Sequence, residues 1–171
     1  MKDRFKSYIR KIRIFINKVG AKERGKLIHQ NYTLISNNCW GGLTYEYLNQ
    51  PFISPTIGLY FFAKEYLKFI SNLKHYIESD LTFINIEDSK YKQALIDNNQ
   101  ADVILGKIDD VEIVFLHYKS KKDAKDKWDK RKKRIDYEHI IYKFNDQNLC
   151  TEEDLKKFSE LPLENKICFT A

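Results

Sequence analysis

The chain has few of the residues that build covalent or metal-bound frameworks. Its 171 residues include three cysteines, Cys39, Cys150 and Cys168, and no two of them form a CxxC pair. This number and spacing disfavour both a structural zinc site and a disulfide framework. We therefore expect a reducing, cytoplasmic setting and assign no metal ligands, while the sequence leaves the cofactor unknown.

The sequence also lacks the short motifs of several enzyme classes. No glycine-rich loop leads into GKS or GKT, no GxGxxG is present, and no DxD pair of the kind common in glycosyltransferases occurs. The opening residues are too charged for a membrane span and have no uninterrupted apolar run for a secretion signal. These absences exclude the most recognisable nucleotide-binding loops.

The composition supports a folded protein with an uneven charge. Hydrophobic residues make up 43% of the chain, which is enough for one domain with a real core. Residues 1–26 and 119–134 together hold twenty of the 30 Lys and Arg residues but only five of the 24 Asp and Glu residues. An acidic body with two basic patches indicates local contacts with anions. Nucleic acid is the least favoured partner, because aromatic residues do not interleave with the second basic run.

The first basic patch predicts an amphipathic helix. Apolar residues recur at helical spacing over residues 1–19, with Lys and Arg on the other faces. Such a helix can lie on an anionic membrane surface, or it can pack on its own domain. We divide the chain into residues 1–26, a basic amphipathic helix and linker, and residues 27–171, a single α/β domain. Since the chain stops directly after an apolar strand, we expect the native protein to continue beyond Ala171.

Strand and helix patterns alternate through the domain. The predicted strands are 31–36, 81–86, 101–108, 111–118, 139–145 and 166–171, and the predicted helices are 43–49, 60–78, 89–99, 121–136 and 151–161. Thr151 and Asp154 approximate a capping box at the start of the last helix. The fold class we expect is α/β, a three-layer and mostly parallel mixed sheet flanked by helices, with one antiparallel hairpin turning at Asp109 and Asp110.

The segment SNNCWGG, residues 36–42, joins the first strand to the first helix of the domain. Open α/β sheets bind ligands at the carboxyl ends of their strands, and a helix start favours phosphate or carboxylate. Gly41 lets the backbone approach a ligand. Asn37 and Asn38 have amides for sugar hydroxyls or phosphate oxygens, and Trp40 has a ring for stacking on a sugar or filling the core.

Cys39 and His117 are the candidate catalytic residues. A thiol near a helix start is expected to have a lowered pKa and to act as a nucleophile, although most lone cysteines are small buried hydrophobes. His117 ends a predicted strand, where it is a candidate general base, a phosphate contact or a satisfied surface histidine. Together the two residues would suit acyl transfer.

The second basic run adds candidate phosphate contacts. Arg131 and Arg134 lie one turn apart beside Trp128, and two arginines can clamp a phosphate or diphosphate, although a solvated basic face is an equally simple interpretation. Ser54 and Thr56 flank a proline in a loop of restricted shape and are candidate hydroxyl contacts.

Three segments together resemble a known family. They are ISNNCWGG (35–42), SPTIGLYF (54–61) and FLHYKSKKDAKDKWDKRKKRI (115–135). The chain is similar here to an uncharacterised bacterial family labelled exopolysaccharide biosynthesis protein or domain of unknown function. The stretch ADVILGKIDD departs from the Tyr-Pro-rich version in that family. The resemblance implies a role in making capsule, lipopolysaccharide or other surface glycans, and it carries over no reaction.

Three functional hypotheses remain from the sequence. The first is a transferase acting on a nucleotide-activated or lipid-linked sugar, placed in the cytoplasm or on the inner membrane face, with a sugar-phosphate or nucleotide-sugar as ligand. The second is a Cys39–His117 enzyme that modifies a glycan by acyl transfer or hydrolysis. The third is a non-catalytic scaffold that binds a glycan or nucleotide.

Overall fold

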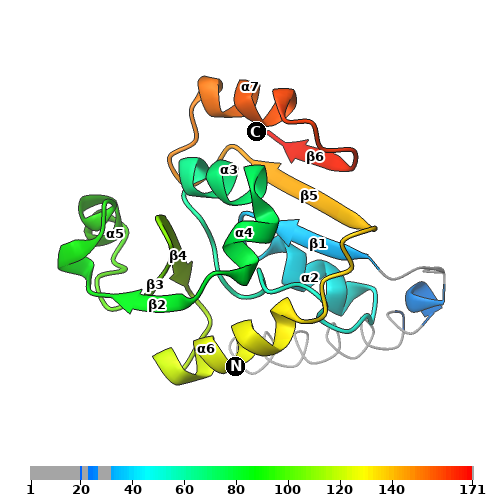
Figure 1. The fold of residues 1–171 in the computed structure, drawn as a ribbon, viewed down its shortest axis with the longest axis horizontal. Helices are drawn as coiled ribbons and strands as arrows, with labels where there is room; N and C mark the ends of the chain where they lie inside the picture. The colour runs from blue at the N-terminus through cyan, green and yellow to red at the C-terminus, as the bar shows by residue number, and fades with distance from the viewer. Residues whose placement is uncertain (1–19, 21–22, 27–31, 171) are drawn as a thin grey trace, which may run out of the picture.

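The computed structural model describes Gly20 and residues 23–26 and 32–170, so the helix predicted over residues 1–19 lies outside the described chain. Its strands and helices alternate around two small sheets (Figure 1). In chain order the elements are β1 (Thr33–Ser36), α2 (Trp40–Tyr47), α3 (Ala63–Ser71), α4 (Leu73–Glu78), β2 (Leu81–Ile84), η1 (Ile86–Asp88), α5 (Lys92–Asp97), β3 (Ile104–Ile108), β4 (Val111–Phe115), α6 (Lys121–Lys132), β5 (Ile140–Asn145), α7 (Glu152–Glu160) and β6 (Lys166–Phe169).

The predicted α/β class is confirmed, but the prediction of one continuous mixed sheet is corrected to two separate sheets. Strands β1, β5 and β6 form a parallel sheet, and β2, β3 and β4 form an antiparallel one. The segment that follows Gly58 separates them. Tyr60 pairs with Val114 on β4, and the Phe61 N–H donates to the Asn37 carbonyl at the end of β1, at 3.0 Å. The segment therefore pairs with backbone groups of β4 and with the carbonyl at the end of β1, so that β4 and β1 do not pair with each other.

The parallel sheet is covered by helices on both faces. On one face, Leu34 of β1 packs with Tyr45 of α2 and with Ile57. On the other, Phe144 of β5 contacts Tyr66 of α3 and a phenylalanine of α7, with ring centroids 5.6 and 5.0 Å apart. Helix α2 thus lies on one side of the sheet, and α3 and α7 lie on the other (Figure 1). This half of the molecule has the predicted three layers.

The antiparallel sheet contains the predicted hairpin. Asp109 adopts a positive φ of 52° at its turn. The Asp109 carboxylate lies 2.9 Å from His75, and Asp110 accepts hydrogen bonds from Lys68 at 2.5 Å and Tyr76 at 3.0 Å. The two acidic residues therefore hold the hairpin against α3 and α4, which agrees with their predicted role as a turn.

Several helix boundaries differ from the predicted ones. Helix α5 is shorter than the predicted 89–99, and α6 ends at Lys132 rather than at residue 136. The helix expected over 60–78 is two helices that meet at Asn72, where φ is −141°. The helix expected over 43–49 begins earlier, at Trp40, so the two glycines of the opening motif lie inside it. The start of α7 is as predicted, because Thr151 and Asp154 form both bonds of a capping box. Within the described ranges, no helix has the length and apolarity to cross a bilayer.

Candidate active site

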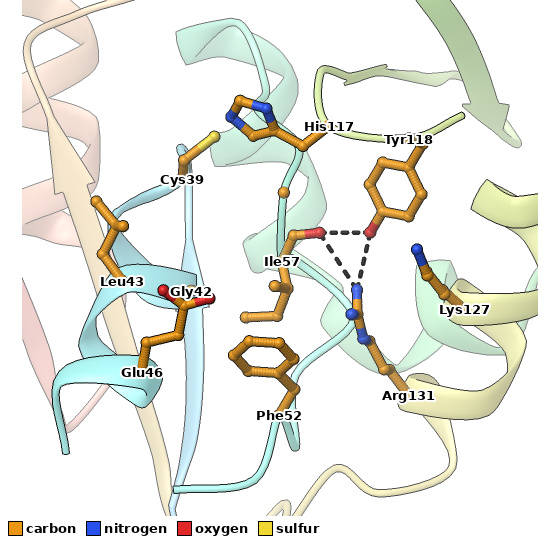
Figure 2. A pocket seen from close by; sticks show the side chains of 11 residues that line it. Cys39, Gly42, Leu43, Glu46, Phe52, Ile57, His117, Tyr118, Lys127 and Arg131 are labelled. Carbon is orange, nitrogen blue, oxygen red and sulfur yellow. Dashed lines mark hydrogen bonds between the residues drawn. The ribbon is translucent and has the colours of Figure 1, made fainter. Parts of the chain in front are cut away.

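A cavity of about 440 Å³ opens between helix α2, the loop over residues 50–58 and helix α6 (Figure 2). It brings residues 39–58 together with residues 117–131, which are far apart in the sequence. Its lining residues are Cys39, Gly42, Leu43, Glu46, Phe52, Ile57, Gly58, His117, Tyr118, Lys127 and Arg131. The cavity therefore joins both candidate catalytic residues with one of the two candidate phosphate contacts.

Cys39 stands directly before α2 and is half-buried. Its sulfur points toward the imidazole of His117 in Figure 2, and its thiol lies 3.8 Å from the Leu59 carbonyl oxygen. Burial raises the pKa of the Cys39 thiol, and a backbone hydrogen bond partly offsets this effect. The lowered pKa expected from the helix start is therefore not observed, because desolvation outweighs the field of a helix of eight residues. A base is needed to form the thiolate.

His117 reaches the cavity from the end of β4 rather than from a strand parallel to β1. Its backbone N–H donates to the Gly58 carbonyl at 3.0 Å, and its side chain is exposed. Gly58 has a φ of 73°, and a Cβ atom there would lie 3.4 Å from the Tyr118 ring and 3.5 Å from the His117 Cβ. A glycine at this position thus allows the loop over 50–58 to dock against the end of β4.

Arg131 and Tyr118 form the inner polar wall. The Arg131 Nη1 donates to the Tyr118 hydroxyl at 2.9 Å and to the Ile57 carbonyl at 3.4 Å. The Tyr118 hydroxyl also donates to the Ile57 carbonyl, which closes the triangle of bonds in Figure 2. In the described part of the chain, both hydrogen bonds of the guanidinium use Nη1. These bonds fix the position of the Arg131 guanidinium, and its other N–H groups remain available to donate to an anion.

The remaining lining gives the cavity one cationic side and one apolar side. Lys127 lies one turn before Arg131 and forms an ion pair with Asp123 at 2.9 Å. Leu43, Phe52 and Ile57 line the cavity with apolar atoms, while Glu46 is exposed on α2. A ligand with a negatively charged group and an apolar or ring portion suits such a lining.

Four predicted contacts from the 50–58 loop and the second basic run lie outside this cavity. Trp128 is fully buried against Phe69 and Phe115, although its indole N–H has no hydrogen-bond partner among the described residues. Arg134 is exposed and donates to a backbone carbonyl of the 50–58 loop at 3.0 Å. Ser54 and Thr56 are fully buried and hydrogen-bonded to each other at 2.9 Å. Trp128 thus fills the core, and the two hydroxyls fix the loop.

The amides of the opening motif lie at the carboxyl edge of the parallel sheet, away from the cavity lining. The Asn37 amide donates to the Asn145 side chain at 2.6 Å. Asn38 donates to Gln147 at 3.3 Å and accepts from Lys143 at 3.1 Å. Both amides therefore have protein partners. The ring of Trp40 is 36% exposed and lies over this cluster, while Gly41 packs its backbone on Ser36.

Sequence reasoning did not single out Tyr118 or Lys143, and it placed Lys127 on one helix stripe with Arg131 and Arg134 without assigning it a contact. Lys127 lies among lysines that look alike in the sequence, and Tyr118 follows directly after His117. For Lys143 a signal exists, because this charged residue sits between Tyr142 and Phe144 in an otherwise apolar strand. Among the residues that the structure describes, no group of three or more His, Cys, Asp and Glu side chains is placed to hold a metal ion.

The fold and the cavity define an α/β protein with a candidate ligand site beside its parallel sheet. The family model described as "Domain of unknown function (DUF1919)" matches residues 10–171. An uncharacterized protein of Haemophilus influenzae (strain ATCC 51907 / DSM 11121 / KW20 / Rd) is 34% identical over 158 residues, which cover 92% of this chain and 69% of that protein. The chain belongs to this family of unknown function, which confirms the predicted membership at that level. Function must therefore be argued from the cavity.

Proposed function

We propose that the protein is a transferase of surface-polysaccharide biosynthesis that acts on a nucleotide-activated or lipid-linked sugar. The observation that supports this proposal is the shared cavity of His117, Lys127 and Arg131. It combines an exposed imidazole with two cations, which are the groups that transfer from a phosphate-activated donor requires. The polysaccharide context comes from the resemblance of the three sequence segments.

In the proposed reaction, the donor phosphates bind at Arg131 and Lys127. The acceptor hydroxyl gives its proton to His117 as its oxygen bonds to the anomeric carbon. The bond between that carbon and the phosphate oxygen breaks, and the electron pair leaves with the phosphate or diphosphate. Arg131 stabilises this negative charge, since its guanidinium presents donors in a fixed plane. Phe52 and Ile57 offer an apolar wall to the rest of the donor.

The proposed location is the cytoplasm, including the inner face of the membrane. A basic amphipathic segment over residues 1–19 would contact an anionic bilayer, where such donors are used. The nucleotide-sugar or sugar-phosphate ligand and the membrane contact both belong to the proposal.

A second candidate is acyl transfer or hydrolysis with Cys39 as nucleophile. It is supported by the placement of Cys39 and His117 in the same cavity, with the sulfur pointing toward the ring (Figure 2). Because burial raises the pKa of Cys39, His117 would have to take the thiol proton as the sulfur attacks an acyl carbon. The bond from that carbon to the donor's leaving group then breaks, and the electron pair departs with the leaving group. Here Lys127 and Arg131 would bind the phosphates of an activated acyl donor.

Ligand binding can be tested with thermal shifts of the full chain in the presence of nucleotide-sugars, uridine diphosphate and sugar phosphates. A ligand that binds the folded state raises the unfolding temperature through linkage. We expect the shift to be lost in Arg131→Gln and kept in Arg134→Gln, since Arg134 lies outside the cavity lining. An equal loss in both variants would contradict the assigned site.

Turnover of the ligand found in this screen separates the hypotheses. We expect His117→Ala to lower the rate by about 10²–10⁴-fold, the usual contribution of a general base. Cys39→Ser keeps the rate if the reaction is sugar transfer, and abolishes it if the reaction is acyl transfer. Tight binding without turnover in the wild-type protein would instead support the scaffold hypothesis and overturn both enzyme proposals.

A further inference from the structure

A lysine side chain lies buried beneath the turn that carries Cys39. Lys143 on β5 is only 2% exposed and pairs in register with Ser36 at the end of β1. Its ammonium donates to the side-chain oxygens of Asn38 at 3.1 Å and Asn37 at 3.3 Å. In the described part of the chain, its hydrogen-bond acceptors are thus amide oxygens rather than carboxylates. Such burial of a charge is costly.

Two aromatic rings and a helix start surround this ammonium. Its nitrogen lies 5.9 Å from the Trp40 ring and 5.7 Å from the Phe169 ring, where cation–π attraction offsets part of the cost. The positive end of the α2 dipole, which begins at Trp40, adds to the cost. Desolvation lowers the pKa of Lys143 to about 8, while Cys168 and Asp146 act in the opposite direction. A residue that costs folding energy at neutral pH is more simply explained by a role in the site than by stability.

One oxygen links the ammonium to the candidate nucleophile. The Asn38 Oδ1 accepts from Lys143, from the Ser36 hydroxyl at 3.3 Å and from the Trp40 N–H at 3.1 Å. Trp40 is the first residue of α2, and Cys39 lies between Asn38 and Trp40 in the chain. The Asn38 Oδ1, which accepts from Lys143, therefore also fixes the backbone on both sides of Cys39.

We propose that Lys143 is a positioning residue that holds the turn over residues 36–40 and so presents Cys39 to the cavity beside His117. This inference rests on the proposed role of the cavity as the active site. Lys143 itself is absent from the cavity lining and touches no substrate in this arrangement. Its function is to keep the thiol half-buried and aimed, which the turn needs because Cys39 has no side-chain cap on α2.

The chain contains a matched control. Lys166 on β6 is half-buried, and its ammonium donates to backbone carbonyls at the end of α7, at 3.2 Å for Phe158 and 2.6 Å for Leu161. A cation at the carboxyl end of a helix is stabilising. Lys166 therefore has an ordinary structural role on the same sheet, without a link to the turn.

The test measures alkylation of Cys39 by iodoacetamide, resolved by mass spectrometry from Cys150 and Cys168, together with the unfolding temperature. We expect Lys143→Met to speed Cys39 alkylation by at least about fivefold, because thiol reactivity follows exposure, with no fall in the unfolding temperature. Lys166→Met should lower the unfolding temperature and leave Cys39 unchanged. A lower unfolding temperature with an unchanged Cys39 rate in Lys143→Met would overturn the proposal.

Asn38→Ala supplies an independent variant if Lys143→Met does not fold. It removes the shared acceptor from the other side and should also speed alkylation of Cys39; an unchanged rate would contradict the proposal. Alkylation of Cys39 reports on the turn over residues 36–40, so it tests the role of Lys143 separately from the proposed function. Faster alkylation of Cys39 in a protein that shows no turnover would support the role of Lys143 and contradict the proposed function.

Fluorescence of Trp40 reports the protonation of Lys143 beside the indole. The wild-type protein should show a transition near pH 8, where Lys143 loses its proton beside the indole. The transition should be absent in Lys143→Met and shifted to lower pH in Cys168→Ser and in Asp146→Asn, since Cys168 and Asp146 both raise the pKa of Lys143. The same transition in Lys143→Met would contradict the assignment.

Discussion

Helices α2 and α7 cover opposite faces of the parallel sheet, but they begin in opposite ways (Figure 1). Helix α7 starts with a capping box and three acidic residues, which complement the helix dipole. The N-cap residue of α2, Cys39, makes no side-chain capping bond, and the first turn of α2 has no acidic residue. Its first N–H, that of Trp40, donates to the Asn38 side chain, and a buried ammonium lies beside it. The start of α7 therefore stabilises the fold. The start of α2 carries a destabilising buried charge next to the candidate nucleophile.

The largest expected effect concerns the start of α2. Lys143 titrates at about 8 in the folded protein and near its ordinary value of 10.5 when unfolded. Between these pH values the unfolded chain holds more protons, so the free energy of unfolding should rise with pH through this window. The rise should reach at most about 3 kcal/mol and be absent in Lys143→Met. Urea unfolding of the wild-type protein and of Lys143→Met at pH 7 to 10.5 measures this rise. The same pH dependence of the unfolding free energy in both proteins would contradict the buried charge.

The next effect concerns the start of α7. Asp154 is 1% exposed and accepts hydrogen bonds from the Thr151 N–H at 3.0 Å and hydroxyl at 2.8 Å. Asp154→Ala leaves these donors unpaired and should lower the free energy of unfolding by about 2 kcal/mol. Alkylation of Cys39 should stay at the wild-type rate. Faster alkylation of Cys39 in Asp154→Ala would show that the starts of α2 and α7 are coupled, and would contradict the distinction between them.

The smallest effect concerns the wall of the cavity. Gly58→Ala forces a side chain into a φ of 73° and should cost about 1 kcal/mol of unfolding free energy. Asn99 has a comparable φ of 56° in a loop after α5, so Asn99→Ala is the matched control. Only Gly58→Ala should weaken binding of uridine diphosphate, measured by calorimetry. Equal binding by both variants would show that the 50–58 loop does not shape the site.

Much of this arrangement could be predicted from local sequence patterns. The hairpin at Asp109, the helix over the second basic run and the capping box at Thr151 each depend on neighbouring residues, and each is present. The grouping of Cys39 with His117 was predicted for a different reason than the one observed. His117 reaches the cavity because Gly58 binds the end of β4, not because its strand is parallel to β1.

The remaining features depend on burial, which local patterns do not give. Cys39 was expected to have a lowered pKa from its place before a helix, but burial raises that pKa. Trp128 lies in a run of lysines, yet it faces Phe69 and Phe115 in the core. Lys143 lies in an apolar strand whose partners come from β1 and β6. Each outcome follows from contacts between segments distant in the chain.

The most direct test of the central claim is ligand protection of Cys39. Pyrophosphate is the simplest probe for Lys127 and Arg131, and a molecule bound there would block the cavity that Cys39 lines. We predict that saturating pyrophosphate slows alkylation of Cys39 in the wild-type protein, but not in Arg131→Gln, and leaves Cys168 unaffected in both. Unchanged labelling of Cys39, or equal protection in Arg131→Gln, would contradict the assignment of this cavity as the ligand site.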